Sequence, residues 1–474
     1  MPNQHLPRPP ESQIRETLEF FFNMRRTDKE IANLLKDYYD TSQYGCSATT
    51  VKRLRKEWNL RGTQQQGHTM ESIQEAITEA REIYPFRGAN TLRNYIFQQK
   101  GMRVPRPLIE KYLRETEPEQ VNARKKRRFV RRAFYAAGVN HLWCMDQHDK
   151  WGPRFGLWFH NCIDPFTGYN NWMKVWWTNK QPRLVASYFL TAVQALGGLP
   201  LLTQSDPGTE NYGVANAQTM GRQCLDSSLL GTLQHVFKHR KTNVKSEGNW
   251  SVFRRDFVPG YENVFQEGVN LGLLTFRWLA IPWIQAEIDG WANLCNSTAP
   301  RRHKYKILLH GPPMLIKMRP QDFNVKDFKV GISPELINEL QQEYAPPDHE
   351  VFQLTPPIFD DAAQTVYAQM NCPKVNHQSF WVVYRDMLRG LEALATERAY
   401  LQHSVDVHAA SLEQMNSENN PINSMELLPN QRRRALNDPT VGFHEEQEVK
   451  EWEDEEQEES DVACAAFSDD EAEL

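Results

Sequence analysis

Apolar positions along the chain change their spacing near residue 138, where a helical period gives way to short apolar runs. Residues 11–62 and 70–120 each carry apolar side chains at the spacing of amphipathic helices, which predicts two helical units. The first unit has two start signals, a capping box at Thr27 and an N-cap residue at Ser47. Helices joined by short turns are therefore expected throughout this N-terminal part.

The helix expected after Ser47 has one apolar face, and basic residues cover most of the rest. These basic residues are Lys52, Arg53, Arg55 and Lys56. A basic helix that follows a short helix and a turn has the arrangement of a helix-turn-helix module, whose second helix meets phosphates and base edges in the major groove. A three-helix bundle with a solvated basic face fits the same pattern. Both interpretations stay open on this pattern alone.

Residues 138–315 alternate between strand-like and helical patterns. The expected elements are strands within 141–145, 155–164 and 169–178, a helix over 183–196 and a fourth strand within 199–206, with mostly helical sequence to about residue 300. Three strands in series, a crossover helix and a further strand describe an α/β fold in which helices cover a sheet.

The sequence beyond residue 315 gives weaker signals. Residues 316–415 form a region of uncertain fold, with a proline-rich stretch over 345–364 that favours extended chain. An amphipathic pattern over 379–401 predicts one long helix. Residues 416–474 are polar and then acidic and lack apolar periodicity, so we expect them to be disordered.

Charge is distributed unevenly along the chain. From Glu445 to the end there are fifteen acidic residues and one lysine, a net charge of −14. Because the whole chain carries −5, residues 1–444 carry +9. A basic body fits a polyanionic partner such as DNA. The basic linker over 121–137 contains RKKRR, which is typical of a nuclear localisation signal, a solvated linker or a segment that contacts nucleic-acid backbone.

Cysteine spacing and hydropathy exclude several classes of protein. The seven cysteines lie far apart, with no C-x-x-C pair and no nearby histidine cluster, so neither a disulfide framework nor a zinc module is indicated. The longest apolar run, residues 184–202, contains Gly197, Gly198 and Pro200, and we interpret it as a core helix followed by a buried strand. No membrane association and no small-molecule cofactor are expected.

Three acidic residues are candidates for chemistry. Asp146 ends the first expected strand, Asp206 ends the fourth, and Glu247 follows 41 positions later near the start of an expected helix. Carboxylates from neighbouring strand ends converge at one edge of a sheet, and hard oxygen ligands suit Mg²⁺ or Mn²⁺. Two such ions can catalyse in-line displacement at phosphorus. Each acid alone also fits a helix cap or an exposed turn residue.

His148 and Asp149 follow the first acid directly. They fit a supporting shell around the metal site, where side chains orient ligands or touch phosphate. A solvated turn after the strand fits them equally well.

Four segments of the chain resemble, in order, the catalytic core of the retroviral-integrase-like DDE transposases. They are VNHLWCMDQHDKW, LWFHNCIDPFTGYNNWMKVWW, LPLLTQSDPGTEN and NVKSEGNWSVFRRDF. The chain is most similar to the eukaryotic integrase core domain proteins, which are widespread in fungi and derive from transposable elements. The resemblance covers about residues 70–315. It implies a ribonuclease H-like fold with a mixed five-stranded sheet flanked by helices.

The resemblance assigns roles residue by residue. Asp146, Asp206 and Glu247 match the family's catalytic, metal-binding triad, which holds two Mg²⁺ or Mn²⁺ ions. Arg254 lies seven positions beyond Glu247 on the same helical face, where integrases carry a DNA-contacting basic residue, and Lys245 is the second DNA contact expected on this helix. The chain departs from the family in having no N-terminal zinc module.

The expected function is therefore DNA integration or transposition in the nucleus. Phosphodiester hydrolysis at an element end is followed by strand transfer into target DNA, with a homo-oligomer as the expected active form. A second interpretation is a domesticated, non-catalytic DNA-binding or scaffold protein derived from a transposase. A third is a metal-dependent nuclease that cuts DNA without joining it.

Overall fold

The chain forms two compact units. The computed structural model describes residues 6–121, 136–238, 244–266, 273–300, 309–397 and 425–431. The first unit comprises residues 1–80 and 89–121, and the second comprises residues 81–88 and 122–474. Most of the predicted basic linker, residues 122–135, lies outside the described residues.

The first unit is helical, as predicted. Its helices are α1 (Glu11–Asn23), α2 (Asp28–Leu34), η1 (Leu35–Tyr38), α3 (Ala48–Glu57), α4 (Thr63–Gln66), most of α5 (Met70–Ile83), α6 (Ala89–Lys100) and α7 (Arg106–Thr116). Both predicted N-terminal signals are confirmed. Thr27 and Glu30 form a reciprocal capping box at α2, and the Ser47 side chain accepts the Thr50 N–H at α3. These caps satisfy backbone groups that would otherwise lack partners.

Arg103 ties the two predicted helical stretches together inside this first unit. Its guanidinium lies 3.7 Å from the Phe22 ring centroid and 4.4 Å from that of Phe97. It also donates hydrogen bonds to the Phe22 carbonyl at 3.2 Å and to Asn23 Oδ1 at 2.9 Å. Burial lowers the pKa of Arg103 to about 10. The arginine therefore stays charged at neutral pH while it bridges α1 and the α6–α7 turn.

The second unit is built on a mixed five-stranded sheet. Its strands are β1 (Leu142–His148), β2 (Trp158–Asp164), β3 (Tyr169–Trp176), β5 (Leu202–Ser205) and β6 (His235–Phe237), in the order β3-β2-β1-β5-β6. The pairs β1–β2 and β2–β3 are antiparallel, whereas β1–β5 and β5–β6 are parallel. A separate short pair joins β4 (Gly198–Leu199) and β7 (Val330–Gly331). The predicted α/β class and the mixed five-stranded sheet are confirmed.

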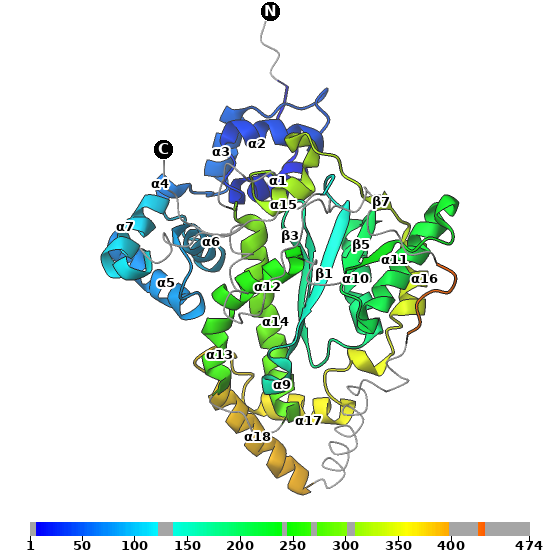
Figure 1. The fold of residues 1–474 in the computed structure, drawn as a ribbon. Coiled ribbons are helices and arrows are strands. Elements are labelled where there is room, and N and C mark those ends of the chain that lie inside the picture. Colours follow the sequence, from blue (N-terminus) through cyan, green and yellow to red (C-terminus); the bar gives the residue numbers. More distant parts are fainter. Residues whose placement is uncertain are drawn as a thin grey trace, which may run out of the picture. The chain divides into compact units, whose positions relative to one another are not determined.

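Helices cover both faces of this sheet. The helices described between β1 and residue 344 are α9 (Gly152–Phe155), α10 (Pro182–Leu196), η2 (Thr209–Asn211), α11 (Tyr212–Leu225), η3 (Ser227–Leu229), α12 (Val244–Asp256), α13 (Val258–Gln266), α14 (Leu273–Ser297), α15 (Pro313–Met318), η4 (Pro320–Phe323) and α16 (Pro334–Tyr344). Figure 1 shows α10, α11 and α16 on one side of the strands and α12 and α14 on the other. Trp143 and Met145 of β1 point into the core formed with α10 and α11. Leu142 and Cys144 point to the opposite face.

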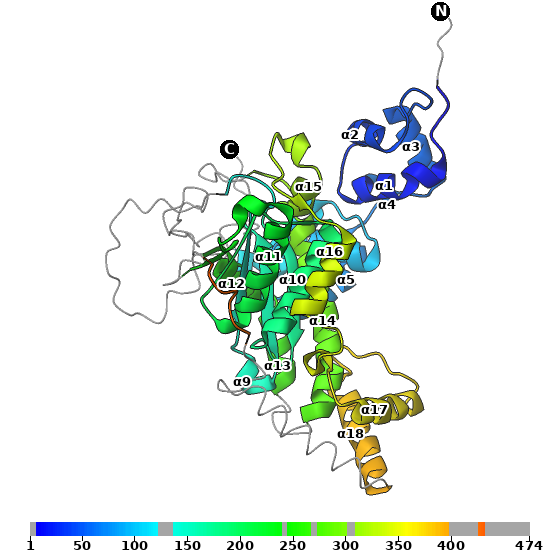
Figure 2. The same cartoon turned by 90° about the vertical axis from the view of Figure 1, so that its right-hand side faces the viewer.

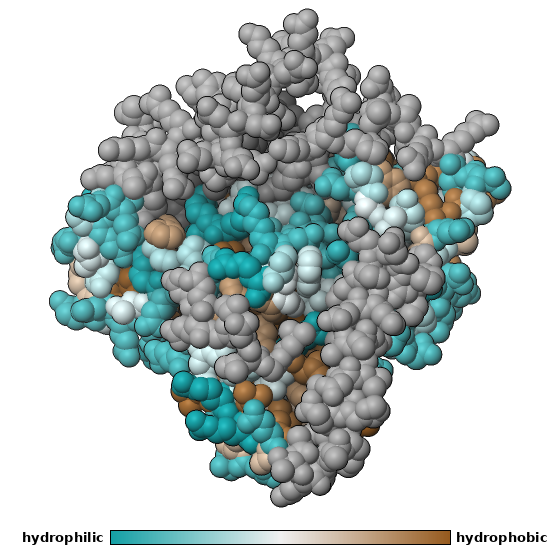
Figure 3. Space-filling model, turned by 60° about the horizontal axis from the view of Figure 1, so that its bottom comes forward, coloured by the Kyte–Doolittle hydropathy of each residue, from teal (hydrophilic) through white to brown (hydrophobic). Residues whose placement is uncertain are grey.

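The proline-rich stretch over 345–364 is not extended throughout, contrary to the prediction. It contains η5 (Glu350–Phe352) and the start of α17 (Pro357–Gln369). The predicted long helix over 379–401 is confirmed as α18 (Phe380–Glu397), which packs beside α17 (Figure 2). Figure 3 brings this end of the molecule forward and shows small hydrophobic areas separated by hydrophilic surface. In the described parts of the chain no helix combines the length and apolar character needed to cross a bilayer.

A short C-terminal segment packs on α11. Most of residues 416–474, where disorder was predicted, lie outside the described residues, but 425–431 are described. The Asn216 amide donates to the Glu426 carbonyl at 2.8 Å and accepts the Leu428 N–H at 3.0 Å. For these seven residues the prediction of disorder is wrong, because one buried side-chain amide holds two of their backbone groups.

The outer edge of the sheet is protected by side-chain amides of α14. Gln285 accepts the Val175 N–H and donates to the Met173 carbonyl, both at 3.0 Å. Asn296 makes the same double contact with the backbone of Asn170, at 2.8 and 3.1 Å. The contacts of Gln285 and Asn296 take up backbone groups of an edge strand that would otherwise be open to pairing. Beside them, a groove of about 870 Å³ runs along β3 between α10 and α14.

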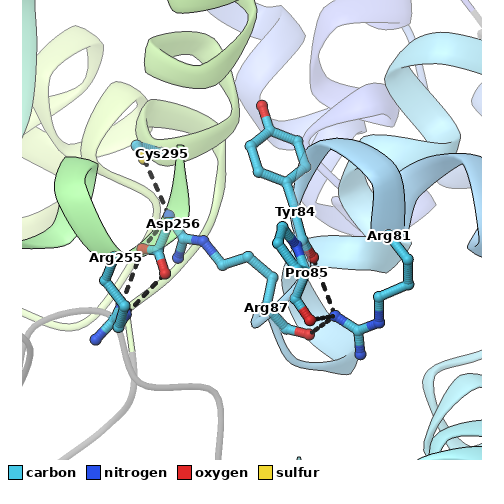
Figure 4. A network of polar contacts seen from close by, with 7 residues as sticks. All are labelled: Arg81, Tyr84, Pro85, Arg87, Arg255, Asp256 and Cys295. Atoms are coloured by element: carbon cyan, nitrogen blue, oxygen red, sulfur yellow. Dashed lines mark hydrogen bonds and ion pairs between the residues drawn. The ribbon is translucent and has the colours of Figure 1, made fainter. Parts of the chain in front are cut away.

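A buried ion pair fixes the loop over residues 81–88 to the helices beneath the sheet (Figure 4). Arg87 is 4% exposed, and its guanidinium lies 3.0 Å from the carboxylate of Asp256, which is 1% exposed. Arg255 also pairs with Asp256, at 2.7 Å, and Arg87 contacts Cys295 Sγ at 3.8 Å. Arg81 donates to three carbonyls of the same loop. Removing one partner would leave a buried charge uncompensated.

Candidate active site

Asp146 and Asp206 lie at the same level on neighbouring parallel strands. The register of β1 and β5 pairs Leu142 with Leu202 and Cys144 with Gln204. Continuing it by two residues places Asp146 opposite Asp206, which directly follows β5. Neighbouring strands are about 4.8 Å apart, and side chains two residues apart share a face. The two predicted acids are therefore adjacent, on the face that carries Cys144.

The prediction that Asp146 ends its strand is wrong by two residues. Strand β1 continues to His148, because Gln147 and His148 still pair with His160 and Phe159 of β2. Asp146 is half-buried, and its Oδ1 accepts the Gln147 N–H at 2.9 Å. Pairing with β2 holds the Asp146 backbone more firmly than a turn would.

Helix α12 packs on the same face of the sheet. The indole of Trp250 stacks on the imidazole of His148 with centroids 5.2 Å apart, and it contacts the Phe159 ring edge to face at 6.4 Å. Glu247 lies three residues before Trp250, one turn nearer the start of the helix. The side chains of Glu247 and Lys245 lie outside the described part of the structure.

A buried histidine fixes the end of β5 beside Asp206. His235 Nδ1 lies 2.8 Å from Thr203 Oγ1, and its Nε2 lies 3.0 Å from Ser205 Oγ. Ser205 Oγ donates its proton to the Asp206 carbonyl at 2.8 Å, so it must accept from Nε2–H. Nδ1 then accepts from Thr203. This neutral tautomer agrees with burial, which lowers the pKa of His235 to about 3.

The loop after Asp206 folds back on itself. A Cβ at position 208 would overlap the Glu210 carboxylate as it is placed, so that side chain would have to move for any residue other than glycine, although the φ of −67° is ordinary. Asn211 Nδ2 donates to Glu210 Oε1 at 3.0 Å and to the Asp206 carbonyl at 3.2 Å. Burial raises the pKa of Glu210, and the charges of Asp149 and Asp206 raise it further. Sequence reasoning gave Glu210 no part in the site, although DPGTEN puts a second acid four residues after the first.

His148 and Asp149, predicted as supporting residues, differ in their surroundings. His148 is 7% exposed and packed against Trp250, and burial lowers its pKa to about 4, with Arg254 and Lys150 adding to the shift. Asp149 is exposed and accepts a hydrogen bond from Asn179 Nδ2 at 2.6 Å. The histidine is therefore a neutral packing group at neutral pH.

Asp164, the other acid in the quoted motifs, has a structural role. It is fully buried at the far end of β2, and its carboxylate accepts the N–H groups of Asn140, Phe166 and Thr167 at 2.9, 3.0 and 3.2 Å. Because β1 and β2 are antiparallel, this end of β2 lies beside the start of β1, away from Asp206.

The basic residues of α3 that are predicted to contact DNA differ in how exposed they are. On α3, Lys52, Arg53 and Lys56 are exposed. Arg55 turns inward, pairs with Asp28, and lies 4.2 Å from the Phe22 ring centroid. Its basic group is therefore engaged inside the first unit.

Arg254 is half-buried on α12, within electrostatic range of His148. Arg254 belongs to the second unit, which also contains Asp146 and Asp206. It lies two helical turns beyond Glu247.

The donors at the candidate site suit a hard cation. Asp146 and Asp206 offer carboxylate oxygens. Mg²⁺ prefers oxygen ligands and needs neither a cysteine sulfur nor a histidine nitrogen. Among the described side chains, which omit that of Glu247, no group of three histidine, cysteine or acidic residues has the geometry of a metal site. Asp146 and Asp206 alone would be an incomplete ligand set for such a cation.

Comparisons with known proteins give no assignment for this chain. No protein-family model matches it, and no curated protein matches it significantly.

Proposed function

We propose that this protein is a DNA integrase or transposase with a two-metal DDE site. The observation that supports this best is the level placement of Asp146 and Asp206 on parallel strands, with the first turns of α12 on the same face. We also propose that the second unit has a ribonuclease H-like fold. Its mixed sheet, with order β3-β2-β1-β5-β6, agrees with that fold.

In this proposal Asp146, Asp206 and Glu247 hold two divalent cations. Bound there, Mg²⁺ ions lower the pKa of the attacking oxygen and neutralise charge that develops on the leaving oxygen. In the first step water attacks a phosphodiester near an element end, and the 3′ oxygen leaves as a hydroxyl. In the second step that hydroxyl attacks a target phosphodiester, so one phosphorus–oxygen bond forms as another breaks. The carboxylates position the reactants, and no covalent protein intermediate is required.

The basic residues would contact the DNA backbone. Arg254 and Lys245 lie on the helix that carries Glu247, and Lys52, Arg53 and Lys56 form the exposed basic surface of α3. Contacts to phosphates release counterions, so affinity should fall steeply with salt. We propose that the protein acts on DNA in the nucleus as a homo-oligomer.

The test is Mn²⁺-dependent nicking of supercoiled plasmid by the full-length protein, because non-specific cleavage requires no knowledge of the element ends. Wild type is expected to nick in Mn²⁺ and not in EDTA. Asp206→Asn keeps the shape of the side chain and removes its charge, so nicking should fall by at least about 100-fold. Asp361→Asn changes an exposed aspartate of α17 in the same way and should nick like the wild type.

The second candidate is a non-catalytic DNA-binding scaffold derived from a transposase. Outward-facing basic residues on α3 fit it as well as they fit the enzyme. DNA binding without Mn²⁺-dependent nicking in wild type would favour the scaffold. Equal nicking by wild type and Asp206→Asn would show that the cleavage comes from another site or from a contaminant.

A further inference from the structure

Asn161 of β2 lies directly opposite Asp146 of β1, and its side chain has no hydrogen-bond partner among the described residues. The residue is 0% exposed. Neither Nδ2 nor Oδ1 makes a hydrogen bond to any described residue. The register of β1 and β2 pairs Asp146 with Asn161. The sequence alone did not mark this asparagine, because in FHNCID it is one of three polar residues in a strand that otherwise reads as apolar.

Asn161 and Asp146 project from the same face of the sheet. Directly opposed residues of an antiparallel pair share a face, and their Cβ atoms are about 4.5–5.5 Å apart. The neighbouring pairs agree with this, because Cys144 and Ile163 lie in one apolar cluster and His148 contacts Phe159. Asn161 thus lies beneath α12, on the face that carries the first acid.

An unpaired buried amide is costly, and two other buried asparagines of this unit have partners. The Asn170 side chain on β3 donates to Asn296 Oδ1 and accepts from Asn249, and the Asn216 amide on α11 is bonded on both sides. Leucine at position 161 would have the same branching and the same number of side-chain heavy atoms, and no polar atom to satisfy. The amide therefore points to a polar ligand that the described residues do not supply.

We propose that Asn161 is a positioning residue for the cation held by Asp146 and Asp206, accepting at Oδ1 a hydrogen bond from a cation-bound water. This inference rests on the proposed function and adds a fourth residue to its site. Mg²⁺ keeps several of its waters when bound by carboxylates, so a buried acceptor beside Asp146 orients one of them. Such outer contacts fix the geometry of the ligands and strengthen binding.

The test measures Mn²⁺ binding by the full-length protein, using the electron paramagnetic resonance signal of free Mn²⁺. Wild type, Asn161→Leu and Asn161→Asp are compared. Asn161→Leu removes the acceptor, so its Kd for Mn²⁺ should rise about 10-fold to 100-fold. Its metal-free melting temperature should equal or exceed that of the wild type, because an unpaired amide is lost. Asn161→Asp keeps an acceptor oxygen and should bind Mn²⁺ at least as tightly as wild type.

A matched control changes the next residue of β2 on the same face. Ile163→Leu repacks this face beside Cys144 without touching a polar group, and it should leave the Kd for Mn²⁺ unchanged. If Ile163→Leu weakens binding as much as Asn161→Leu does, the effect is general repacking and the inference is wrong.

The outcomes separate this inference from the proposed function. Wild-type affinity in Asn161→Leu, with binding lost in Asp206→Asn, would overturn the role of Asn161 and leave the metal site in place. Absence of Mn²⁺ binding in wild type would overturn both. Should Asn161→Leu fail to fold, weaker binding by Asn161→Asp than by wild type would be enough to reject the acceptor role.

Discussion

The Trp250 indole stacks on the His148 imidazole at 5.2 Å, with 23° between the ring planes. His148 is two residues beyond Asp146 on β1, and Trp250 is three residues beyond Glu247 on α12. This stack therefore helps to set how the helix that carries Glu247 lies on the strand that carries Asp146. The Asn249 side chain also donates to Asn170 Oδ1 of β3, so aromatic packing and a polar contact together hold α12 on the sheet.

Replacing His148 tests whether its role is packing or chemistry. Because burial lowers its pKa to about 4, the ring is neutral at pH 7 and offers the helix a flat surface. His148→Phe should keep both stability and Mn²⁺-dependent nicking. His148→Ala should lose about 1–3 kcal/mol of unfolding free energy and most of the nicking. Loss of nicking in a stable His148→Phe protein would instead assign chemistry to the imidazole nitrogens.

The loop after Asp206 is predicted to show strong coupling between positions 208 and 210. Gly208→Ala should destabilise the protein by about 1–3 kcal/mol and slow nicking, because the new methyl group displaces the Glu210 carboxylate. In a Glu210→Ala background the same change should cost little, since φ at this position is −67°. A double-mutant cycle on urea unfolding measures the coupling. Additive effects would show that Glu210 is not the obstacle.

His235 should make stability depend on pH. Its pKa is about 3 in the folded protein against 6.5 for the free group, so the unfolded chain binds the proton first as pH falls. The stability that this histidine contributes is complete above pH 6.5 and is lost toward pH 3, by up to about 1.4 kcal/mol per pH unit.

His235→Gln removes this titration. The variant should be less stable than wild type at pH 7.5, because the two buried hydrogen bonds change, and the difference should shrink by about 1–2 kcal/mol at pH 5.0. Urea unfolding at both pH values measures it. A difference that stays constant would mean that His235 is not held neutral.

Two arginines of α3 should behave in opposite ways. Arg53 is exposed, so Arg53→Ala should weaken DNA binding and lower the slope of log affinity against log salt by about 1, without changing the melting temperature. Arg55 is engaged with Asp28 and Phe22, so Arg55→Ala should destabilise the protein by about 1–2 kcal/mol. Fluorescence anisotropy with duplex DNA and thermal unfolding separate the effects. Similar results for both variants would refute the assignment.

Much of the second unit could be predicted because its strands are strongly marked. The aromatic runs that became β1, β2 and β3 are separated by turn residues, and α10 ends at Gly197 as expected. Strand β6 has three residues, too few to show a period. Helix α17 was hidden by Pro356 and Pro357, which begin the helix instead of interrupting extended chain.

Parts of the site depend on pairing that no local pattern records. The polar end of β1, from Asp146 to His148, is a strand because β2 continues beside it. The level placement of Asp206 follows from the register of β5, and the position of Asn161 follows from that of β2. The acids could be selected as candidates from the sequence alone. The residues that lie beside them in space could not, because tertiary contacts decide them.

Asp146 and Asp206 are proposed to share a divalent cation, and anomalous diffraction from crystals of the full-length protein soaked in Mn²⁺ would locate that cation. We expect an anomalous peak about 2.1 Å from a carboxylate oxygen of each residue, which disappears in Asp206→Asn crystals. Manganese peaks found only elsewhere on the protein, or none at a saturating concentration, would contradict it.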